Sequence, residues 1–284
     1  MKKVSFSLLL FACLALVGCQ EDSLLTDDTG GVSAVGASSG FVPDGYSLVW
    51  NDEFDYEGLP DSTKWGYQTG GHGWTAKELQ KYVRADPDNV GVEDGKLRIT
   101  ALSEFTGGNQ YTSTRLVTKR KADFTLGYFE VRAKMPVGPG LRSSFWMVGD
   151  TVSKMGWPLA GEIDIFEHYS KFPGVVNAAV QNYDNYWTKR NQKGGSKIVK
   201  TAQEEFHVYS CTWDYRKLTF AVDGETYFTY EQPPGRGWQG YPYRWPFYMV
   251  ATVAVGGMRG PQTPPDPEME PAHMLIDYVR VYQK

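Results

Sequence analysis

Three cysteines in 284 residues are too few to form a disulfide framework for a chain of this length. Positive charge is not in excess either, because 29 Lys and Arg stand against 33 Asp and Glu, for a formal net charge of −4. This balance argues against a nucleic-acid-binding protein, which normally carries a basic face. The 31 glycines and 16 prolines are frequent without being dominant, which excludes collagen-like and wholly disordered classes.

Aromatic residues, by contrast, are abundant, at 9 Trp, 18 Tyr and 14 Phe. So many tryptophans and tyrosines, together with few helix-favouring runs, suggest a β-rich protein with aromatic-lined grooves. The length is sufficient for one large domain or two small ones, and either would bury a full-sized core.

Residues 1–18 are predicted to be a secretory signal peptide of the lipoprotein type. Two lysines precede the apolar run 4–17, which is shorter than the roughly 20 residues that a membrane-spanning helix needs. The tetrad Leu16-Val17-Gly18-Cys19 resembles a bacterial lipobox, in which cleavage leaves Cys19 as the lipidated first residue. An ordinary signal peptide with a chance cysteine is the alternative.

The residues after Cys19 predict where the protein is placed and how it is tethered. Glu21 and Asp22 resemble a surface-export signal, so we expect an outer-membrane lipoprotein exposed on the cell surface. Residues 19–40 are rich in Ser, Gly, Asp and Thr without periodicity, which predicts a flexible tether to the lipid. The globular domain is predicted to run from 41 to 284, with Cys211 as a buried, inert thiol.

Short alternating segments dominate that domain. Between Phe129 and Met135 apolar side chains alternate with Glu130, Arg132 and Lys134, which predicts a strand with one wet face. Residues 274–282 alternate in the same way.

Turn residues separate these segments. Asp94-Gly95 predicts a tight turn, and Asp223-Gly224 predicts the turn of a hairpin over 218–228. A helical turn is expected only at 201–206. Many short strands of this kind predict an all-β fold, an antiparallel β-sandwich of jelly-roll type.

The segment 162–167 concentrates three carboxylates, those of Glu162, Asp164 and Glu167. Three carboxylates in six residues are costly on a buried face because like charges repel and each resists desolvation. With strict alternation Glu167 would point away from the other two. A single β-bulge at Ile165-Phe166 would return it to their face, so that all three line one stripe of a sheet.

Such a stripe suits retaining glycoside hydrolysis, in which one carboxylate attacks the anomeric carbon and a second, protonated, donates to the leaving oxygen. An Asp between the two can share a proton with the nucleophile. A solvated acidic strand face or a calcium site are the alternatives for an isolated acidic strand.

Glu-Ile-Asp-Ile-Phe-Glu at 162–167 looks like the active-site signature of family 16 glycoside hydrolases in its bulged form. The similarity extends over most of the domain, and the subgroup it most resembles is laminarinase-like. The other matching segments are 48–54, 111–116, 127–134, 145–147, 254–257 and 276–282. The resemblance implies a concanavalin A-like jelly roll, in which two curved antiparallel sheets carry a substrate groove.

The resemblance also implies roles for individual residues. Glu162 would be the nucleophile, Asp164 its assistant and Glu167 the acid/base, with no cofactor required for catalysis. Trp146 and Trp157 would lie in the groove near the cleaved sugar, where an indole packs well on the C–H face of a pyranose. Packing in the sandwich core is the alternative for both.

Further contacts are implied at Arg115 and Glu78. Arg115 would hydrogen-bond a sugar hydroxyl, with a plain salt bridge as the alternative, and Glu78 would contact substrate from a groove loop. A structural calcium ion is implied at Glu53, the Gly95 carbonyl and Asp277, since calcium prefers oxygen ligands. Unpaired surface carboxylates are the alternative there.

Departures from the laminarinase pattern leave the substrate open. Arg142 replaces a tryptophan, Gln181 replaces a histidine, and Met258-Arg259 replaces an Asn-Trp pair. Guanidinium groups prefer sulfate or carboxylate partners, so Arg142 and Arg259 are candidate contacts for a glycan other than plain β-glucan. Gln181 is a further candidate substrate contact. A β-glucan such as laminarin and a galactose-containing glycan (algal galactan, mucin or keratan type) are both compatible with the sequence.

The aromatic loop 235–240 matches a dinucleotide motif only as a string, since it neither follows a strand nor opens a helix. It is predicted to form a groove rim, where Trp238 and Tyr241 are either exposed or packed.

The sequence thus predicts a monomeric, endo-acting retaining β-glycosidase that cleaves internal β-1,3 or β-1,4 linkages of a polysaccharide or complex glycan. Its predicted partners are that glycan and, through Cys19, the membrane, but no nucleic acid. A catalytically idle, glycan-binding surface lipoprotein of the same fold is the alternative.

Overall fold

The computed structural model describes residues 38–284 except residue 75 and residues 258–264. The predicted signal peptide, the lipidation residue Cys19, nearly all of the tether and the candidate substrate contact Arg259 therefore lie outside the described residues. Within the described part of the chain, no helix is both long and apolar enough to cross a membrane.

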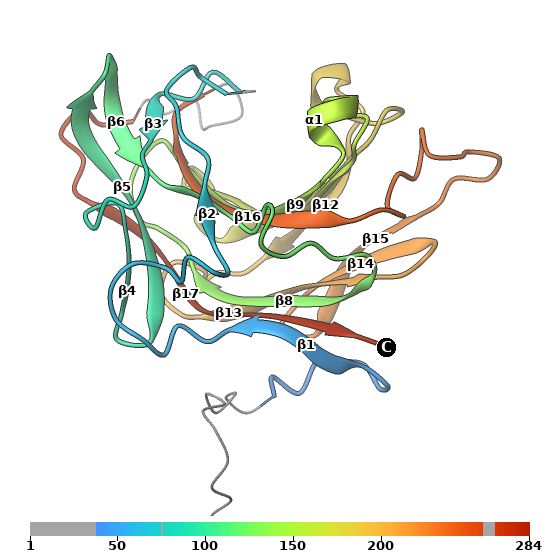
Figure 1. The fold of residues 1–284 in the computed structure, drawn as a ribbon. Coiled ribbons are helices and arrows are strands. Elements are labelled where there is room, and N and C mark those ends of the chain that lie inside the picture. The colour runs from blue at the N-terminus through green and yellow to red at the C-terminus, as the bar shows by residue number, and fades with distance from the viewer. Residues whose placement is uncertain (1–37, 75, 258–264) are drawn as a thin grey trace, which may run out of the picture. The chain divides into compact units, whose positions relative to one another are not determined.

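Two β-sheets lie face to face and form a sandwich, which confirms the predicted all-β fold (Figure 1). The ten-stranded sheet contains β1 (Ser47–Asp52), β3 (Gln80–Tyr82), β4 (Val90–Glu93), β5 (Lys96–Thr106), β6 (Asn109–Ser113), β8 (Gly127–Lys134), β13 (His207–Trp213), β14 (Lys217–Val222), β15 (Glu225–Glu231) and β17 (Ala272–Gln283). The seven-stranded sheet contains β2 (Gly66–Tyr67), β7 (Arg115–Val117), β9 (Leu141–Gly149), β10 (Glu162–Tyr169), β11 (Val175–Gln181), β12 (Lys193–Ile198) and β16 (Phe247–Val255).

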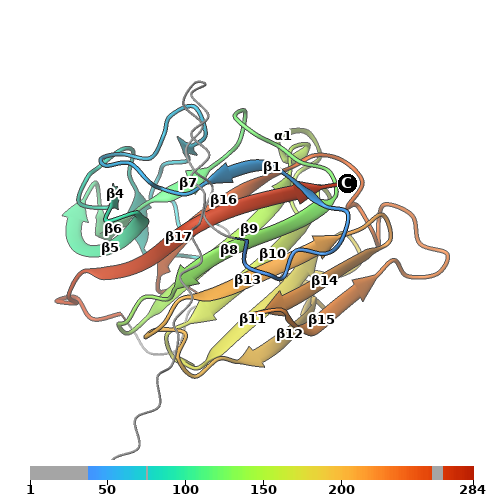
Figure 2. The ribbon, with the colours of Figure 1, turned by 90° about the horizontal axis from the view of Figure 1, so that it is seen from below.

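Strand pairing in both sheets is antiparallel except between β3 and β6. The seven-stranded sheet has the order β12-β11-β10-β9-β16-β7-β2, which puts β10, with its carboxylates, between β9 and β11. Seen from below, the strands of the two sheets run roughly along one diagonal (Figure 2). The strand order also makes neighbours of strands that are distant in sequence. One example is β9 and β16, whose register pairs Trp146 with Val250.

The core fills the space between the two sheets. Phe166 of β10 lies 4.8 Å from Tyr209 of β13, and Trp213 of β13 lies 5.1 Å from Phe247 of β16, measured between ring centroids. Both pairs join one sheet to the other, and all four side chains are buried. Cys211 is a free, buried thiol in the same core, as expected, and burial raises its pKa.

The turn predictions are confirmed by backbone angles. Asp94 and Gly95 both have positive φ, of 51° and 68°, and connect β4 to β5. Asp223 and Gly224, with φ of 49° and 77°, connect β14 to β15. Such angles are favoured at Asp-Gly pairs because both residues tolerate the left-handed region.

The structure contains more helical turns than the sequence predicted. A helical turn does occur at Thr201, whose carbonyl accepts hydrogen bonds from the amides of Glu204 and Glu205. Two further short helices, α1 (Val152–Met155) and a 3₁₀ turn at Trp187–Lys189, were not anticipated, because each is too short to show a periodic pattern.

The predicted wet face of β8 is not wet throughout. Glu130 is only 1% exposed, because Ser39 donates a hydrogen bond to it and the guanidinium of Arg280 lies 3.8 Å away. The outer face of the ten-stranded sheet is thus covered locally by a network of charged and polar groups. Alternation alone could not reveal this cover, since the covering groups come from both ends of the chain.

A β-bulge interrupts β10 where it was predicted. Asp164 pairs with Trp146 and Phe166 with Phe145 on β9, so Ile165 is the extra residue. Both Ile165 and Phe166 are buried in the core. The bulge therefore resets the alternation of the strand, and carboxylates on either side of it share one face.

Deletion of Ile165 is expected to leave a folded protein with a lowered melting temperature, because removing the extra residue restores simple alternation with Phe166 still on the core side. Circular dichroism should show one cooperative thermal transition. Deletion of Ile163 is the matched control: it puts a carboxylate on the core side in either register, and we expect no cooperative transition. Loss of the fold in both deletions would contradict this account of the bulge.

Candidate active site

The face of the seven-stranded sheet that points away from the core, called here the groove face, carries a cavity of about 150 Å³. Its floor comes from β7, β9, β10 and β16, and loops complete its walls. Figure 1 shows the segments around β3 and around α1 rising on this side of the sheet, at opposite ends of its strands. The lining residues are Trp74, Glu78, Arg115, Arg142, Ser144, Trp146, Val148, Val152, Trp157, Glu162, Asp164, Glu167, Trp187 and Tyr248.

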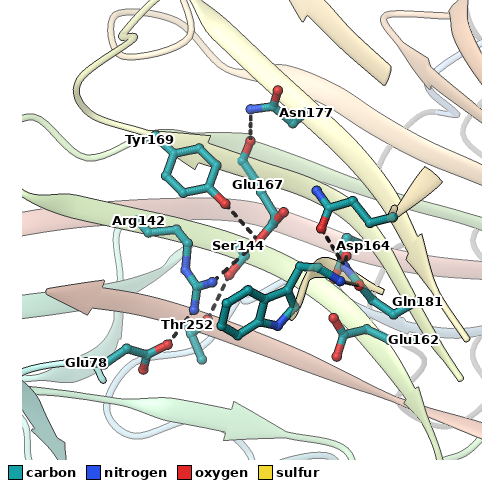
Figure 3. Close-up of polar contacts among 12 residues, drawn as sticks. Glu78, Arg142, Ser144, Glu162, Asp164, Glu167, Tyr169, Asn177, Gln181 and Thr252 are labelled. Carbon is teal, nitrogen blue, oxygen red and sulfur yellow. Dashed lines mark hydrogen bonds and ion pairs between the residues drawn. The ribbon is translucent and has the colours of Figure 1, made fainter. Parts of the chain in front are cut away.

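The three carboxylates of β10 all line this cavity (Figure 3). Glu162, Asp164 and Glu167 are 8%, 2% and 4% exposed, so each is nearly withdrawn from water. Three acidic groups so close together in a poorly solvated site repel one another, and their neighbours must supply hydrogen bonds or positive charge.

Glu162 and Asp164 each receive a hydrogen bond from a neutral donor. The indole nitrogen of Trp157 donates to Oε2 of Glu162 at 3.0 Å. The amide nitrogen of Gln181 donates to Oδ2 of Asp164 at 3.3 Å, while Oε1 of Gln181 accepts the amide of Trp187 at 3.0 Å. Neutral donors orient the two carboxylates without adding a formal charge beside them.

Glu167, across the bulge, has a different environment. The hydroxyl of Tyr169 donates to Oε1 of Glu167 at 3.3 Å, and Nη1 of Arg142 lies 3.5 Å from the same oxygen. Asn177 of β11 donates to the backbone carbonyl of Glu167 at 3.3 Å, which fixes the strand at this position. The two glutamates therefore differ in surroundings, one beside an indole and the other beside a cation.

Arg142 links Glu167 to the wall of the cavity. Its Nη2 lies 2.5 Å from Oε1 of Glu78, whose other oxygen accepts hydrogen bonds from Gln80 at 2.8 Å and Tyr82 at 3.2 Å. Burial by itself would lower the pKa of Arg142, but the negative charges around it, first among them that of Glu78, together outweigh burial, and the pKa is raised. The guanidinium charge is thus balanced within the protein.

Arg115 is packed between two tryptophans. Its guanidinium lies 4.6 Å from the ring of Trp74 and 4.6 Å from that of Trp146, and its Nε donates to Gln68 at 2.6 Å. Burial lowers the pKa of Arg115. Cation–π contacts on both sides hold the group in place, and they also occupy part of the Trp146 ring that the sequence assigned to sugar stacking.

Two of the three predicted calcium ligands, Glu53 and Asp277, are paired with arginines. Glu53 makes a two-pronged ion pair with Arg280, with nitrogen–oxygen distances of 2.9 and 2.8 Å, and Asp277 pairs with Arg132 at 2.5 Å. Both carboxylates line one cavity together with these two arginines, whereas Gly95 does not line it. Among the described residues no group of three or more acidic, His or Cys side chains is placed to hold a metal ion.

The structure brings most of the sequence-predicted groove residues to one cavity. Trp146 and Trp157 line it rather than packing within the main core, and Glu78, Arg115 and Arg142 line it as well. Gln181 is fully buried beside Asp164 and is absent from the lining, which argues for support of that carboxylate rather than contact with a sugar.

Several lining residues were not anticipated from the sequence. Trp74 lies on a loop and Trp187 begins the 3₁₀ turn, whereas Ser144 and Tyr248 lie on the floor strands β9 and β16. For Trp187 the sequence does carry a signal of a groove position, because it ends an aromatic-rich run that follows β11. Ser144 and Tyr248 carried none, because a polar side chain within a strand has many ordinary uses.

Residues 48–284 match a family model described as "Beta-porphyranase A-D, GH16 domain". The beta-glucanase of Rhodothermus marinus is 42% identical over 259 residues, which cover 89% of this chain and 91% of that protein. The keratan-sulfate endo-1,4-beta-galactosidase of Sphingobacterium multivorum is 30% identical over 300 residues, which cover 100% of this chain and 68% of that protein. The X-ray structure of the laminarinase from Rhodothermus marinus has a TM-score of 0.81 at 43% identity, covering 84% of this chain and 97% of that one.

Glu78→Gln should lower the free energy of unfolding by about 3 kcal/mol, because it leaves the buried Arg142 without its main counter-charge. Guanidinium chloride denaturation followed by tryptophan fluorescence measures this loss.

Glu93→Gln is the matched control for that measurement. Glu93 also lies 2.5 Å from an arginine, Arg98, but its side chain is 53% exposed, so we expect a loss of about 0.5 kcal/mol or less. Equal losses in the two variants would mean that burial does not strengthen the Glu78–Arg142 pair.

Proposed function

The chain belongs to glycoside hydrolase family 16, and we propose that it is an endo-β-1,3-glucanase that cleaves internal linkages of laminarin-type glucans with retention of configuration. The observation that carries the proposal is the stripe of Glu162, Asp164 and Glu167 on the floor of the groove-face cavity. A protein that only binds glycan has no physical need for three adjacent, poorly solvated carboxylates.

In the first step, a carboxylate oxygen of Glu162 attacks the anomeric carbon as the bond to the glycosidic oxygen breaks. Glu167 gives its proton to that oxygen, so the leaving chain departs as an alcohol and the sugar remains as an ester on Glu162. The Trp157 hydrogen bond holds Glu162 in position for this attack. Asp164, oriented by Gln181, lies between the two glutamates and shares a proton with the nucleophile.

In the second step, water attacks the anomeric carbon of the ester. Glu167, now ionised, removes a proton from the water, and the carboxylate of Glu162 leaves. Two inversions at one carbon give net retention. Arg142 lies 3.5 Å from Oε1 of Glu167, and the hydroxyl of Tyr169 donates to the same oxygen, so both hold the carboxyl group that gives and takes the proton. Glu78 balances the charge of Arg142.

The choice of a β-1,3-glucan rests on the relatives and on the state of Arg142. The beta-glucanase and laminarinase of Rhodothermus marinus combine high identity with nearly complete coverage of both chains. Arg142, which the sequence marked as a candidate for binding sulfate, already has Glu78 and Glu167 as partners. A substrate sulfate would have to compete with both.

A galactose-containing glycan is the second candidate. It is favoured by the description of the matching family model, which names β-porphyranases, and by the similarity to a keratan-sulfate galactosidase. Arg259, the other arginine that the sequence marked for decorated glycans, lies outside the described residues.

We further propose that the mature protein is lipidated on Cys19 and displayed on the outer face of the outer membrane, as a monomer. The Leu16–Cys19 tetrad and the acidic pair Glu21 and Asp22 support this proposal. A surface location suits an enzyme whose polymeric substrate is too large to enter the cell.

Glu162→Gln should lower kcat on laminarin by about four orders of magnitude or more, because an amide cannot form the glycosyl ester. Binding of laminari-oligosaccharides should persist in calorimetry, and Glu93→Gln should retain full turnover as the control. Unchanged turnover in Glu162→Gln would refute the mechanism. Proton NMR of wild-type digests should show the β anomer first, and initial α anomer would exclude retention.

On a panel of laminarin, mixed-linkage glucan, porphyran and keratan sulfate, we expect kcat/KM to be highest on laminarin, by roughly tenfold or more over the galactans. The expected difference arises because the axial 4-hydroxyl of galactose changes the polar contacts that a glucose ring makes in the groove. Fastest cleavage of porphyran or keratan sulfate would instead establish the second candidate.

Labelled palmitate should be incorporated into the wild-type protein and into Cys211→Ser, but not into Cys19→Ser, when each is expressed in a bacterium with the lipoprotein pathway. Protease added to intact cells of a host with surface export should digest the labelled protein. Absence of label in the wild type would refute lipidation, and protection from protease would refute surface display.

A further inference from the structure

Two loops beyond the cavity each expose an aromatic side chain. Tyr183 follows β11 and is 46% exposed, and Trp238 lies in the long connection between β15 and β16 and is 41% exposed. Their ring centroids are 6.1 Å apart with an angle of 52° between the planes. Figure 1 shows the β15–β16 connection extending beyond the strand ends on the side of α1. Tyr241 of the same loop is buried, so only the tryptophan of the predicted rim is presented outward.

The two loops are tied to each other, so the exposed pair has a fixed base. Asp184 forms an ion pair with Arg236 through two nitrogens, one of them at 2.8 Å, and its amide donates to the carbonyl of Gln239 at 3.1 Å. Beneath them Asn182 is fully buried and donates to the hydroxyl of Tyr230 at 3.2 Å. Burying these two large aromatic side chains would stabilise the fold, so loops that keep them exposed to water indicate a binding surface.

An unbroken series of contacts connects this pair to the catalytic stripe. The ammonium of Lys189 lies 5.0 Å from the ring of Tyr183 and 4.7 Å from that of Tyr186. Tyr186 meets the ring of Trp157 edge-on at 5.6 Å, and Trp157 donates to Glu162. The exposed pair is therefore connected through Lys189 and Tyr186 to Trp157, which contacts the proposed nucleophile.

We propose that Tyr183 and Trp238 form a distal subsite that binds a hexopyranose ring of the polysaccharide substrate, several residues away from the bond that is cleaved. The C–H face of a pyranose packs on exposed aromatic rings, and such packing tolerates different sugars because it needs no particular hydroxyl pattern. Asp184 and Arg236 at the base supply polar groups for the ring hydroxyls. The proposal rests on the proposed function, because it assigns this patch to the same polymer.

A distal subsite acts on long substrates only, and this separates it from the catalytic machinery. A polymer that occupies both the cavity and the distal subsite gains binding at both, whereas a short oligosaccharide that fills only the cavity does not reach it. Loss of the subsite should therefore weaken polymer binding and leave the chemical step unchanged.

The test compares Trp238→Ala, Tyr183→Ala and the double variant with wild-type enzyme on laminarin and on laminaritriose. For the double variant we expect KM on laminarin to rise roughly tenfold, with kcat on laminarin and kcat/KM on laminaritriose within twofold of wild type. Phe105→Ala, which removes another aromatic that is 75% exposed, is the matched control and should change neither. Thermal unfolding of each variant checks that the loops remain folded.

The outcomes distinguish this proposal from the proposed function. If the wild type hydrolyses laminarin and the double variant has an unchanged KM on laminarin, the distal-subsite proposal is overturned while the proposed function stands. An equal loss on polymer and trisaccharide also overturns it, because the patch would then act on the catalytic groups. If the wild type cleaves porphyran and not laminarin, the glucan assignment fails, and the same comparison of porphyran with its short oligosaccharides tests the subsite.

Discussion

The repulsion among three carboxylates on one strand is the constraint around which the rest of the groove is arranged. Glu162, Asp164 and Glu167 share a face because a bulge of one residue resets the alternation of β10. A poorly solvated site makes each negative charge more costly, and the same site makes each carboxylate more reactive toward a bound sugar. The neighbouring strands and loops supply hydrogen bonds and positive charge to the carboxylates, and the three carboxylates receive different partners.

That difference gives the two glutamates different chemistry. Glu162 accepts a hydrogen bond from the neutral indole of Trp157. Glu167 lies near Arg142, whose charge is balanced from the other side by Glu78. In the mechanism that we propose, the nucleophile remains ionised while the acid/base exchanges a proton, so the two glutamates need different surroundings. Arg142 stands where the laminarinase pattern has a tryptophan, and the structure pairs it with Glu78.

Aromatic side chains form a second organising element, and they serve different purposes in different places. Trp213 and Phe247 join the two sheets in the core. Trp74 and Trp146 both contact the guanidinium of Arg115 in the cavity, so the indoles there hold a cation. Tyr183 and Trp238 are presented to solvent by loops that are tied together at their base.

Local patterns in the sequence determined the strands, the Asp-Gly turns and the bulge, because each depends on side-chain alternation or on backbone angles within a few residues. They also placed the three carboxylates on one stripe. Tertiary structure alone decided which residues pair with one another. Arg142 on β9 pairs with Glu78, which lies on a loop 64 residues earlier in the sequence. Glu130, predicted to face solvent, is covered by Ser39, which lies 91 residues earlier. Such pairings depend on which strands become neighbours in the sheets, and periodicity along a single strand carries no information about its neighbours.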